Sequence, residues 1–185
     1  MVKSFFGAVL RGSIWLVRRG PAVIFLRLGL QAYRKITGHP VYRYSRITEG
    51  LYVGGQHRRH GWASMQAEGI TAVLNLRRRD DVPRGVASNN YLHLPTPDNH
   101  PPTQYDLQRG VDFIRAQVEA GGKVYVHCGV GVGRAPTMAA VYLVSTGLSV
   151  DEAWRLLRHH RPIIFPLRGQ TRAVKAFAAN IADNE

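Results

Sequence analysis

A cysteine, three glycines and an arginine lie close together in the second half of the chain. Cys128 is the only cysteine, Gly129, Gly131 and Gly133 follow it at alternating positions, and Arg134 closes the run. A glycine-rich loop can turn successive backbone N–H groups inward as an anion nest, and a guanidinium can bind two oxygens of one oxyanion. The same field stabilises a thiolate, so the spacing predicts a nucleophilic Cys128 beside an oxyanion site.

The segments that flank this loop predict a strand before it and a helix after it. Residues 123–127 (KVYVH) alternate and are β-prone, which indicates a short buried strand. Residues 135–146 are apolar and compatible with a helix that stops at Gly147, and the positive end of that helix adds to the anion site. A nucleotide P-loop is excluded because the chain has no G-x-x-x-x-G-K-[ST] motif. A buried free cysteine beside a flexible turn is the alternative interpretation.

Residues 127–134, HCGVGVGR, resemble the signature of the cysteine-based protein tyrosine phosphatase superfamily. The surrounding chain, from about residue 41 to 183, resembles the small, atypical dual-specificity phosphatases, including their "lyvGgq"-like opening at residues 51–56. The resemblance implies a phosphate-binding role for the loop and a supporting role for His127, which would orient the loop by hydrogen bonding. The implied phosphate-binding residues are Gly129, Val130, Gly131, Val132, Gly133 and Arg134.

Cleavage of a phosphate monoester by a thiolate also needs an acid that protonates the departing oxygen. The proline-rich segment at residues 95–102, PTPDNHPP, contains Asp98, which lies thirty residues before Cys128. The resemblance assigns the general acid to an aspartate at about this spacing on a mobile loop. The alternative is that Asp98 is a turn residue that caps the next helix. His100 is an exposed neighbour or a helper of Asp98.

One position departs from the family pattern. The family usually has Ser or Thr directly after the arginine, where the hydroxyl stabilises the departing thiolate in the second step. Here Ala135 takes that position and Pro136 follows it. We therefore expect the attack on phosphorus to be retained and the hydrolysis of the intermediate to be slower. Thr137 lies two residues further on, and its hydroxyl either faces the sulfur or points away from it.

The rest of the catalytic region alternates strand-like and helix-like segments, which predicts an α/β fold with a central, mostly parallel sheet flanked by helices. A Gln at a helix start, Gln170, is similarly placed in the family and is expected to face the active site, or to have no function. His57 and His60 lack the acidic partners of a metal site and are interpreted as surface residues. We expect strands within residues 41–56, 70–76, 90–95 and 123–127, and helices at about 57–68, 103–120, 135–146, 151–160 and after 166.

The net charge of +13 is concentrated at the N-terminus. Residues 1–46 contain nine Lys or Arg and no acid, and residues 47–185 contain the other 16 basic and all 12 acidic residues. We therefore divide the chain into a basic segment at residues 1–40 and a catalytic domain at residues 41–185. Arg11, Arg18, Arg19 and Arg27 interrupt the apolar stretches, so a transmembrane helix is not expected.

Residues 1–38 form two apolar stretches separated by Gly20-Pro21, with basic residues gathered on one side of each helical wheel. This pattern suits an anionic membrane surface, and the alternative is a helix pair that packs on the catalytic domain or on a partner. Nucleic acid is not expected as a partner, since no nucleic-acid motif accompanies the charge. The single cysteine fits a reducing compartment, so we expect a cytoplasmic protein at the periphery of a membrane.

These observations predict a phosphatase that hydrolyses phosphate monoesters through a cysteinyl-phosphate intermediate. The first hypothesis is a dual-specificity phosphatase that acts on phosphoproteins. The second is a membrane-associated phospholipid phosphatase that resembles phosphatidylglycerophosphate phosphatase. The third is a catalytically inactive module that binds phosphate groups. The chemistry requires no cofactor, and the sequence contains no constellation of metal ligands.

Overall fold

The computed structural model describes residues 44–57 and 59–183. The predicted basic segment at residues 1–40 lies outside the described residues. Within them, five strands form one sheet in the order β1-β2-β5-β3-β4. β1 pairs with β2 in antiparallel fashion, and the other three pairings are parallel, which confirms the mostly parallel sheet. The strands are β1 (Ser45–Arg46), β2 (Leu51–Gly54), β3 (Ala72–Asn75), β4 (Tyr91–His93) and β5 (Val124–His127).

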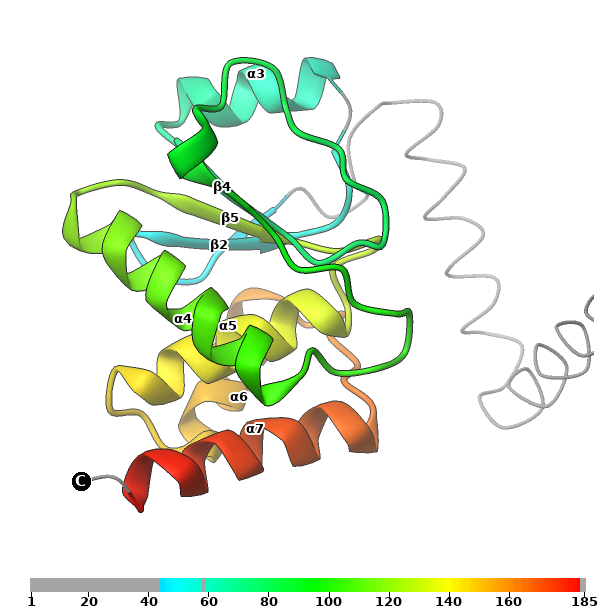
Figure 1. The fold of residues 1–185 in the computed structure, drawn as a ribbon, viewed down its shortest axis with the longest axis vertical. Helices are drawn as coiled ribbons and strands as arrows, with labels where there is room; N and C mark the ends of the chain where they lie inside the picture. The colour runs from blue at the N-terminus through cyan, green and yellow to red at the C-terminus, as the bar shows by residue number, and fades with distance from the viewer. Residues whose placement is uncertain (1–43, 58, 184–185) are drawn as a thin grey trace, which may run out of the picture.

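The helices cover both faces of the sheet, as Figure 1 shows: α3 lies on one face, and α4 to α7 lie on the other. They are α3 (Arg59–Ala67), the 3₁₀ turn η1 (Ser88–Asn90), α4 (Gln104–Glu119), α5 (Arg134–Ser145), α6 (Val150–His160) and α7 (Arg168–Ala182). All the predicted helices are present, and their ends lie close to the predicted positions. The predicted strands are present but shorter, because only their central residues make ladder hydrogen bonds.

Local signals in the sequence explain where several helices begin and end. The side chain of Thr103 accepts a hydrogen bond from the Asp106 amide at the start of α4. Ser149 and Glu152 form a reciprocal capping box at the start of α6. Gly69 and Gly147 follow α3 and α5 with φ of 84° and 99°, a conformation that glycine adopts without a Cβ penalty.

The central strand, β5, contributes side chains to two hydrophobic cores. Val124 and Val126 point into the larger core, which is shared with α4, α5, α6 and α7. Tyr125 points to the opposite face and packs in a smaller core with Trp62 and Met65 of α3. This alternation buries β5 on both faces and fixes the position of the loop that follows it.

His57 is buried, so the prediction of a surface position for this residue is wrong. Its side chain is 6% exposed, and its ring stacks on Tyr125 with the ring centroids 5.7 Å apart. Trp62 contacts the same imidazole edge-on. Burial lowers the pKa of His57 to about 4. The sequence shows no acidic partner for His57, but Tyr125 of the central strand and Trp62 of the following helix enclose it instead.

Among the described residues, no helix has both the length and the apolar composition needed to cross a membrane.

Candidate active site

The site lies where parallel strands of the sheet end, the usual position for ligand sites in open α/β sheets. Cys128 follows β5 directly and is 3% exposed. Its Sγ accepts a hydrogen bond from the amide of Gly131 at 3.3 Å. The N-terminus of α5 begins at Arg134, six residues after the sulfur. A loop amide and a helix N-terminus both favour negative charge beside Cys128.

Every carbonyl of the loop from Gly129 to Gly133 is bound by a donor outside the loop. In a planar trans peptide the N–H points opposite to the preceding carbonyl, so outward carbonyls turn the amides of residues 130–134 inward. The hydrogen bond from Gly131 to Sγ is consistent with this orientation. The loop therefore forms an anion nest next to the sulfur. The donors are the amides of Gln56 (3.1 Å), Phe165 (2.7 Å) and Thr137 (3.0 Å), together with Nη2 (3.3 Å) and Nε (2.8 Å) of Arg161.

Arg161 is a residue of this site that the sequence alone does not reveal. Its side chain is 1% exposed, and it binds the carbonyls of Val130 and Gly131 from behind the loop. In the sequence, Arg161 precedes Pro162 and marks only the end of a helix. No local pattern distinguishes a buried arginine of this kind from a solvated one, because its partners lie about thirty residues earlier in the chain.

Gly131 is the loop glycine that the fold requires most clearly. Its φ is 76°, which L-residues with a side chain rarely adopt. A Cβ at this position would lie 2.5 Å from the carbonyl oxygen of Gly54 and 2.8 Å from Nη2 of Arg161. Both the backbone conformation and the close approach of β2 therefore exclude other residues here.

Arg134 is held by the carbonyl oxygens that follow two neighbouring strands. Its side chain is buried, and its Nη1 donates to Leu76 at 3.2 Å and to Thr96 at 2.7 Å. Its Nη2 lies 3.2 Å from Oδ1 of Asp98. The guanidinium is thus fixed in orientation at one end of the nest, and it contacts the predicted acid.

The structure places Asp98 in a turn beside Arg134, and Asp98 is not the cap of the next helix. Thr103, and not Asp98, caps α4. The Asp98 carboxylate pairs with Arg134, although the side chain is 65% exposed. Asn99 follows with a φ of 69°, the only positive value for a non-glycine residue in the described part of the chain. His100 is exposed, and its Nδ1 lies 3.0 Å from the carbonyl oxygen of Asp98.

Gln170 also reaches the site. It is 1% exposed, and its side-chain atoms lie so close to Gly133 that a Cβ there would meet them at 3.0 to 3.1 Å. Its Nε2 donates to the carbonyl of His100 at 3.3 Å. Gln170 therefore contacts the glycine-rich loop and the segment that contains Asp98.

His127 is fully buried, and the backbone of Cys128 acts on its imidazole, where it raises the pKa against the larger lowering by burial. Within the described residues, neither ring nitrogen makes a hydrogen bond. The ring instead stacks on Tyr125, with the centroids 5.4 Å apart and the planes 9° from parallel, and it also contacts His57. Burial lowers the pKa of His127 to about 3, so the imidazole is neutral at physiological pH. Its ring packs directly before the loop, and its hydrogen-bonding role in the loop stays a prediction.

The hydroxyl of Thr137, the candidate for the role that Ala135 cannot take, is bound to the loop backbone. The hydroxyl of Thr137 donates to the carbonyl of Gly133 at 2.8 Å, so that hydrogen is directed to the backbone of the loop. Ala135 itself is fully buried.

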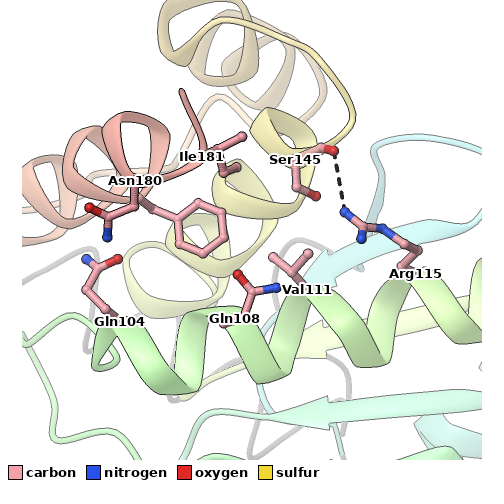
Figure 2. Close-up of a pocket in the computed structure, with 8 residues that line it drawn as sticks. Gln104, Gln108, Val111, Arg115, Ser145, Asn180 and Ile181 are labelled. Carbon is pink, nitrogen blue, oxygen red and sulfur yellow. Dashed lines mark hydrogen bonds between the residues drawn. The ribbon is translucent and has the colours of Figure 1, made fainter. Parts of the chain in front are cut away.

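A separate cavity of about 520 Å³ lies between α4, α5 and α7 and contains none of the predicted site residues (Figure 2). Its lining includes Gln104, Arg115 and Phe177, and Arg115 donates to the carbonyl of Ser145 at 3.5 Å. In the described part of the chain, no group of three or more His, Cys, Asp or Glu side chains could hold a metal ion.

Comparison with known proteins agrees with this fold and site. The family model for the dual specificity phosphatase catalytic domain matches residues 51–180. The chain therefore belongs to the dual specificity phosphatase family, within the cysteine-based protein tyrosine phosphatase superfamily. It contains a cysteine-based phosphatase domain.

Curated relatives are similar over the same region. The chain is 33% identical over 124 residues to dual specificity protein phosphatase 16 of Homo sapiens, which covers 66% of this chain and 19% of the relative. It is 32% identical over 126 residues to dual specificity protein phosphatase 1 of Mus musculus, covering 65% of this chain and 33% of the relative. The chain thus spans a third or less of the length of these relatives.

Solved structures share the fold. PTPMT1 superposes with a TM-score of 0.67 at 25% identity, covering 76% of this chain and 97% of PTPMT1. PTPMT1 has also been solved in complex with PI(5)P. Human DUSP28 superposes with a TM-score of 0.70 at 23% identity, covering 76% of this chain and 99% of DUSP28.

Proposed function

We propose that this protein hydrolyses phosphate monoesters of phosphoproteins through a cysteinyl-phosphate intermediate on Cys128. The observation that supports it best is the loop from Gly129 to Gly133, whose five outward carbonyls turn a row of amides inward beside Sγ. Such a nest matches the three equatorial oxygens of a transferring phosphoryl group, on which the transition-state charge is spread.

In the first step, the Cys128 thiolate attacks phosphorus and a P–S bond forms as the ester P–O bond breaks. The amides of residues 130–134 and the Arg134 guanidinium bind the equatorial oxygens. Asp98 transfers its proton to the departing oxygen, which leaves as an alcohol or a phenol. The pairing of Asp98 with Arg134 at 3.2 Å supports this assignment, because it brings the carboxyl group to the guanidinium that binds the phosphate.

In the second step, a water molecule attacks the phosphorus of the cysteinyl phosphate. Asp98, now ionised, accepts the proton of that water, the P–S bond breaks, and phosphate and the thiolate are released. Ala135 offers no hydroxyl to the departing sulfur. We therefore expect the second step to limit the rate with reactive substrates.

Phosphoproteins are the first substrate class because relatives above 30% identity are named dual specificity protein phosphatases. Phospholipids are the second. Phe165 favours phospholipids as substrates. Its side chain is 59% exposed, and its amide donates to the carbonyl of Val132 in the loop. An exposed apolar ring therefore lies at the edge of the site. PTPMT1, which shares the fold, has been solved with PI(5)P.

A substrate panel tests the activity and separates the two classes. Wild type should release phosphate from an aryl phosphate, and Cys128→Ser should abolish that release. Greater turnover of phosphotyrosine and phosphothreonine peptides than of vesicles containing phosphatidylglycerophosphate supports the first class, and the reverse supports the second. Binding of phosphopeptide without release from any substrate would show a non-catalytic module.

We also propose that residues 1–40 form a separate basic segment that associates with an anionic membrane surface, beside a catalytic domain at residues 41–185. The clustered Lys and Arg residues among aromatic and aliphatic ones support this proposal. Replacing Arg11, Arg18, Arg19 and Arg27 by Gln in the full chain should weaken binding to anionic vesicles and leave aryl phosphate cleavage unchanged. Binding that is insensitive to these replacements and to salt would contradict the proposal.

A further inference from the structure

We infer that Gln170 is a positioning residue that holds the segment at residues 97–102, here called the Asp98 segment, so that the Asp98 carboxyl group stays at Arg134. The inference rests on the proposed function, in which Asp98 is the general acid. It gives Gln170 a role in leaving-group protonation in the first step, through the backbone of the Asp98 segment.

Both ends of the Gln170 amide are used, and they connect different parts of the chain. Oε1 accepts from the amide of Leu167 at 2.8 Å and caps the start of α7. Nε2 donates to the carbonyl of His100 at 3.3 Å, two residues after Asp98. At 1% exposure the side chain is shielded from water, which strengthens the hydrogen bonds that it makes.

Gln170 also lies against the loop that binds phosphate in the proposed function. A Cβ on Gly133 would lie 3.0 Å from Oε1 and 3.1 Å from Nε2 of Gln170. One rigid amide at the start of α7 is therefore in contact with the loop and with the Asp98 segment. It sets the spacing between the proposed acid and the proposed phosphate site.

The Asp98 segment needs such a contact because burial does not hold the carboxyl group. The Asp98 side chain is 65% exposed. Asn99 has a φ of 69°, a left-handed conformation that asparagine tolerates better than most residues with a side chain. Nε2 of Gln170 bonds to the carbonyl of His100, the residue after Asn99, so it is placed to hold this turn where the Asp98 carboxyl group meets Arg134.

The expected effect of replacing Gln170 depends on the leaving group of the substrate. A substrate whose phenol leaves readily needs little protonation, whereas a substrate with a poorer leaving group depends on the acid. We compare 4-nitrophenyl phosphate, which has the better leaving group, with phenyl phosphate. The constant to measure is kcat/KM, which covers the steps up to the first irreversible one and so omits hydrolysis of the intermediate.

Gln170→Met, which keeps the length of the side chain and removes both polar ends, should lower kcat/KM for phenyl phosphate about tenfold. For 4-nitrophenyl phosphate the loss should be less than about twofold. In the background of Asp98→Asn, Gln170→Met should have almost no further effect on phenyl phosphate, since the acid through which it acts is absent. Thr171→Ala is the matched control: it removes a hydroxyl that donates to the carbonyl of Arg168 at the same helix start, and it should leave kcat/KM for both substrates unchanged.

Three results would overturn the inference. The first is an equal loss of kcat/KM for both substrates. The second is a loss in kcat with kcat/KM unchanged. The third is an effect of Gln170→Met on kcat/KM for phenyl phosphate that is as large in the Asp98→Asn background as in wild type. The second would assign Gln170 to the water of the second step. If thermal unfolding shows that Gln170→Met does not fold, Gln170→Asn replaces it, because its shorter amide cannot span the Leu167 and His100 backbone groups. If Asp98→Asn itself affects both substrates equally, the failure lies in the proposed acid and not in Gln170.

Discussion

Arg161 donates from Nε to the carbonyl oxygen of Gly131 at 2.8 Å, and this contact joins the end of α6 to the tip of the loop that follows Cys128. The same guanidinium reaches Val130 through Nη2 at 3.3 Å. A buried cation behind the loop therefore fixes two of the five outward carbonyls. The shape of the loop depends on a residue that does not face the sulfur.

Arg161→Met should destabilise the protein by about 3 kcal/mol, because it leaves buried carbonyls without a donor. We also expect inorganic phosphate to inhibit the variant at least about tenfold less well, since the inward amides are no longer held. Denaturant unfolding and competitive inhibition measure the two effects. Arg155→Met, which changes an exposed arginine of α6, should shift stability by less than about 0.5 kcal/mol. Equal behaviour of the two variants would contradict the role of Arg161.

Gly131→Ala and Gly121→Ala separate backbone strain from close approach. The two glycines have φ values of 76° and 77°, so each alanine pays a similar conformational cost of about 1 kcal/mol. Only Gly131 has backbone atoms of Gly54 in the space of the new Cβ, whereas nothing lies within 4 Å at Gly121. Gly131→Ala should therefore lose about 2 kcal/mol more stability than Gly121→Ala and most of its phosphatase activity. Comparable losses of stability for both variants would show that backbone strain alone accounts for the requirement for glycine at position 131.

Two buried histidines predict that the protein loses stability as the pH falls. Folding lowers the pKa of His57 from 6.5 to about 4 and that of His127 to about 3, in each case mainly through burial. Below pH 6.5 the unfolded chain binds protons that the folded protein excludes, so unfolding becomes easier down to about pH 4. Each histidine contributes up to about 1.4 kcal/mol per pH unit in that window.

Urea unfolding at pH 7.5 and at pH 5 measures this dependence. His57→Gln should remove about half of the loss of stability that the two buried histidines cause between pH 7.5 and pH 5, whatever its effect on stability at pH 7.5. His159→Gln removes an exposed imidazole at the end of α6 and should keep the wild-type slope. A wild-type stability that is flat between pH 7.5 and pH 5 would contradict the prediction.

Ala135 predicts accumulation of the cysteinyl phosphate. With 4-nitrophenyl phosphate, wild type should show a burst of nitrophenol close to one equivalent, followed by a slower steady state. Ala135→Ser supplies a hydroxyl next to the departing sulfur, so it should raise the steady-state rate about tenfold or more and reduce the burst. Rapid-mixing absorbance measures both phases. A linear trace for wild type would show that the second step is already fast.

The sequence predicted the parts of this protein that depend on neighbours in the chain. The helices predicted from about residues 103 and 151 begin at Gln104 and Val150, and the run from Cys128 to Arg134 lies between a strand and a helix as expected. The placement of Asp98 beside Arg134 also agrees with the expectation that a separate segment approaches the loop.

The parts that the sequence did not predict depend on contacts between distant residues. His57 is buried because Tyr125, on the distant strand β5, stacks on its ring, while Trp62 of the following helix contacts it edge-on. Arg161 acts on carbonyls about thirty positions earlier, and Gln170 acts on one that is seventy positions earlier. A residue type and its neighbours do not reveal such partners, so a buried arginine looks like an ordinary helix end.

The outward carbonyls of residues 129–133 have a consequence for how this site could change. The proposed grip on phosphate uses main-chain amides, which every amino acid other than proline supplies, so it does not depend on the side chains of Val130 and Val132. We therefore expect substitutions at these two positions to keep the affinity for the phosphoryl group. The loop can thus vary in sequence at residues 130 and 132 without losing its phosphate contacts, whereas Gly131 cannot be replaced in this way.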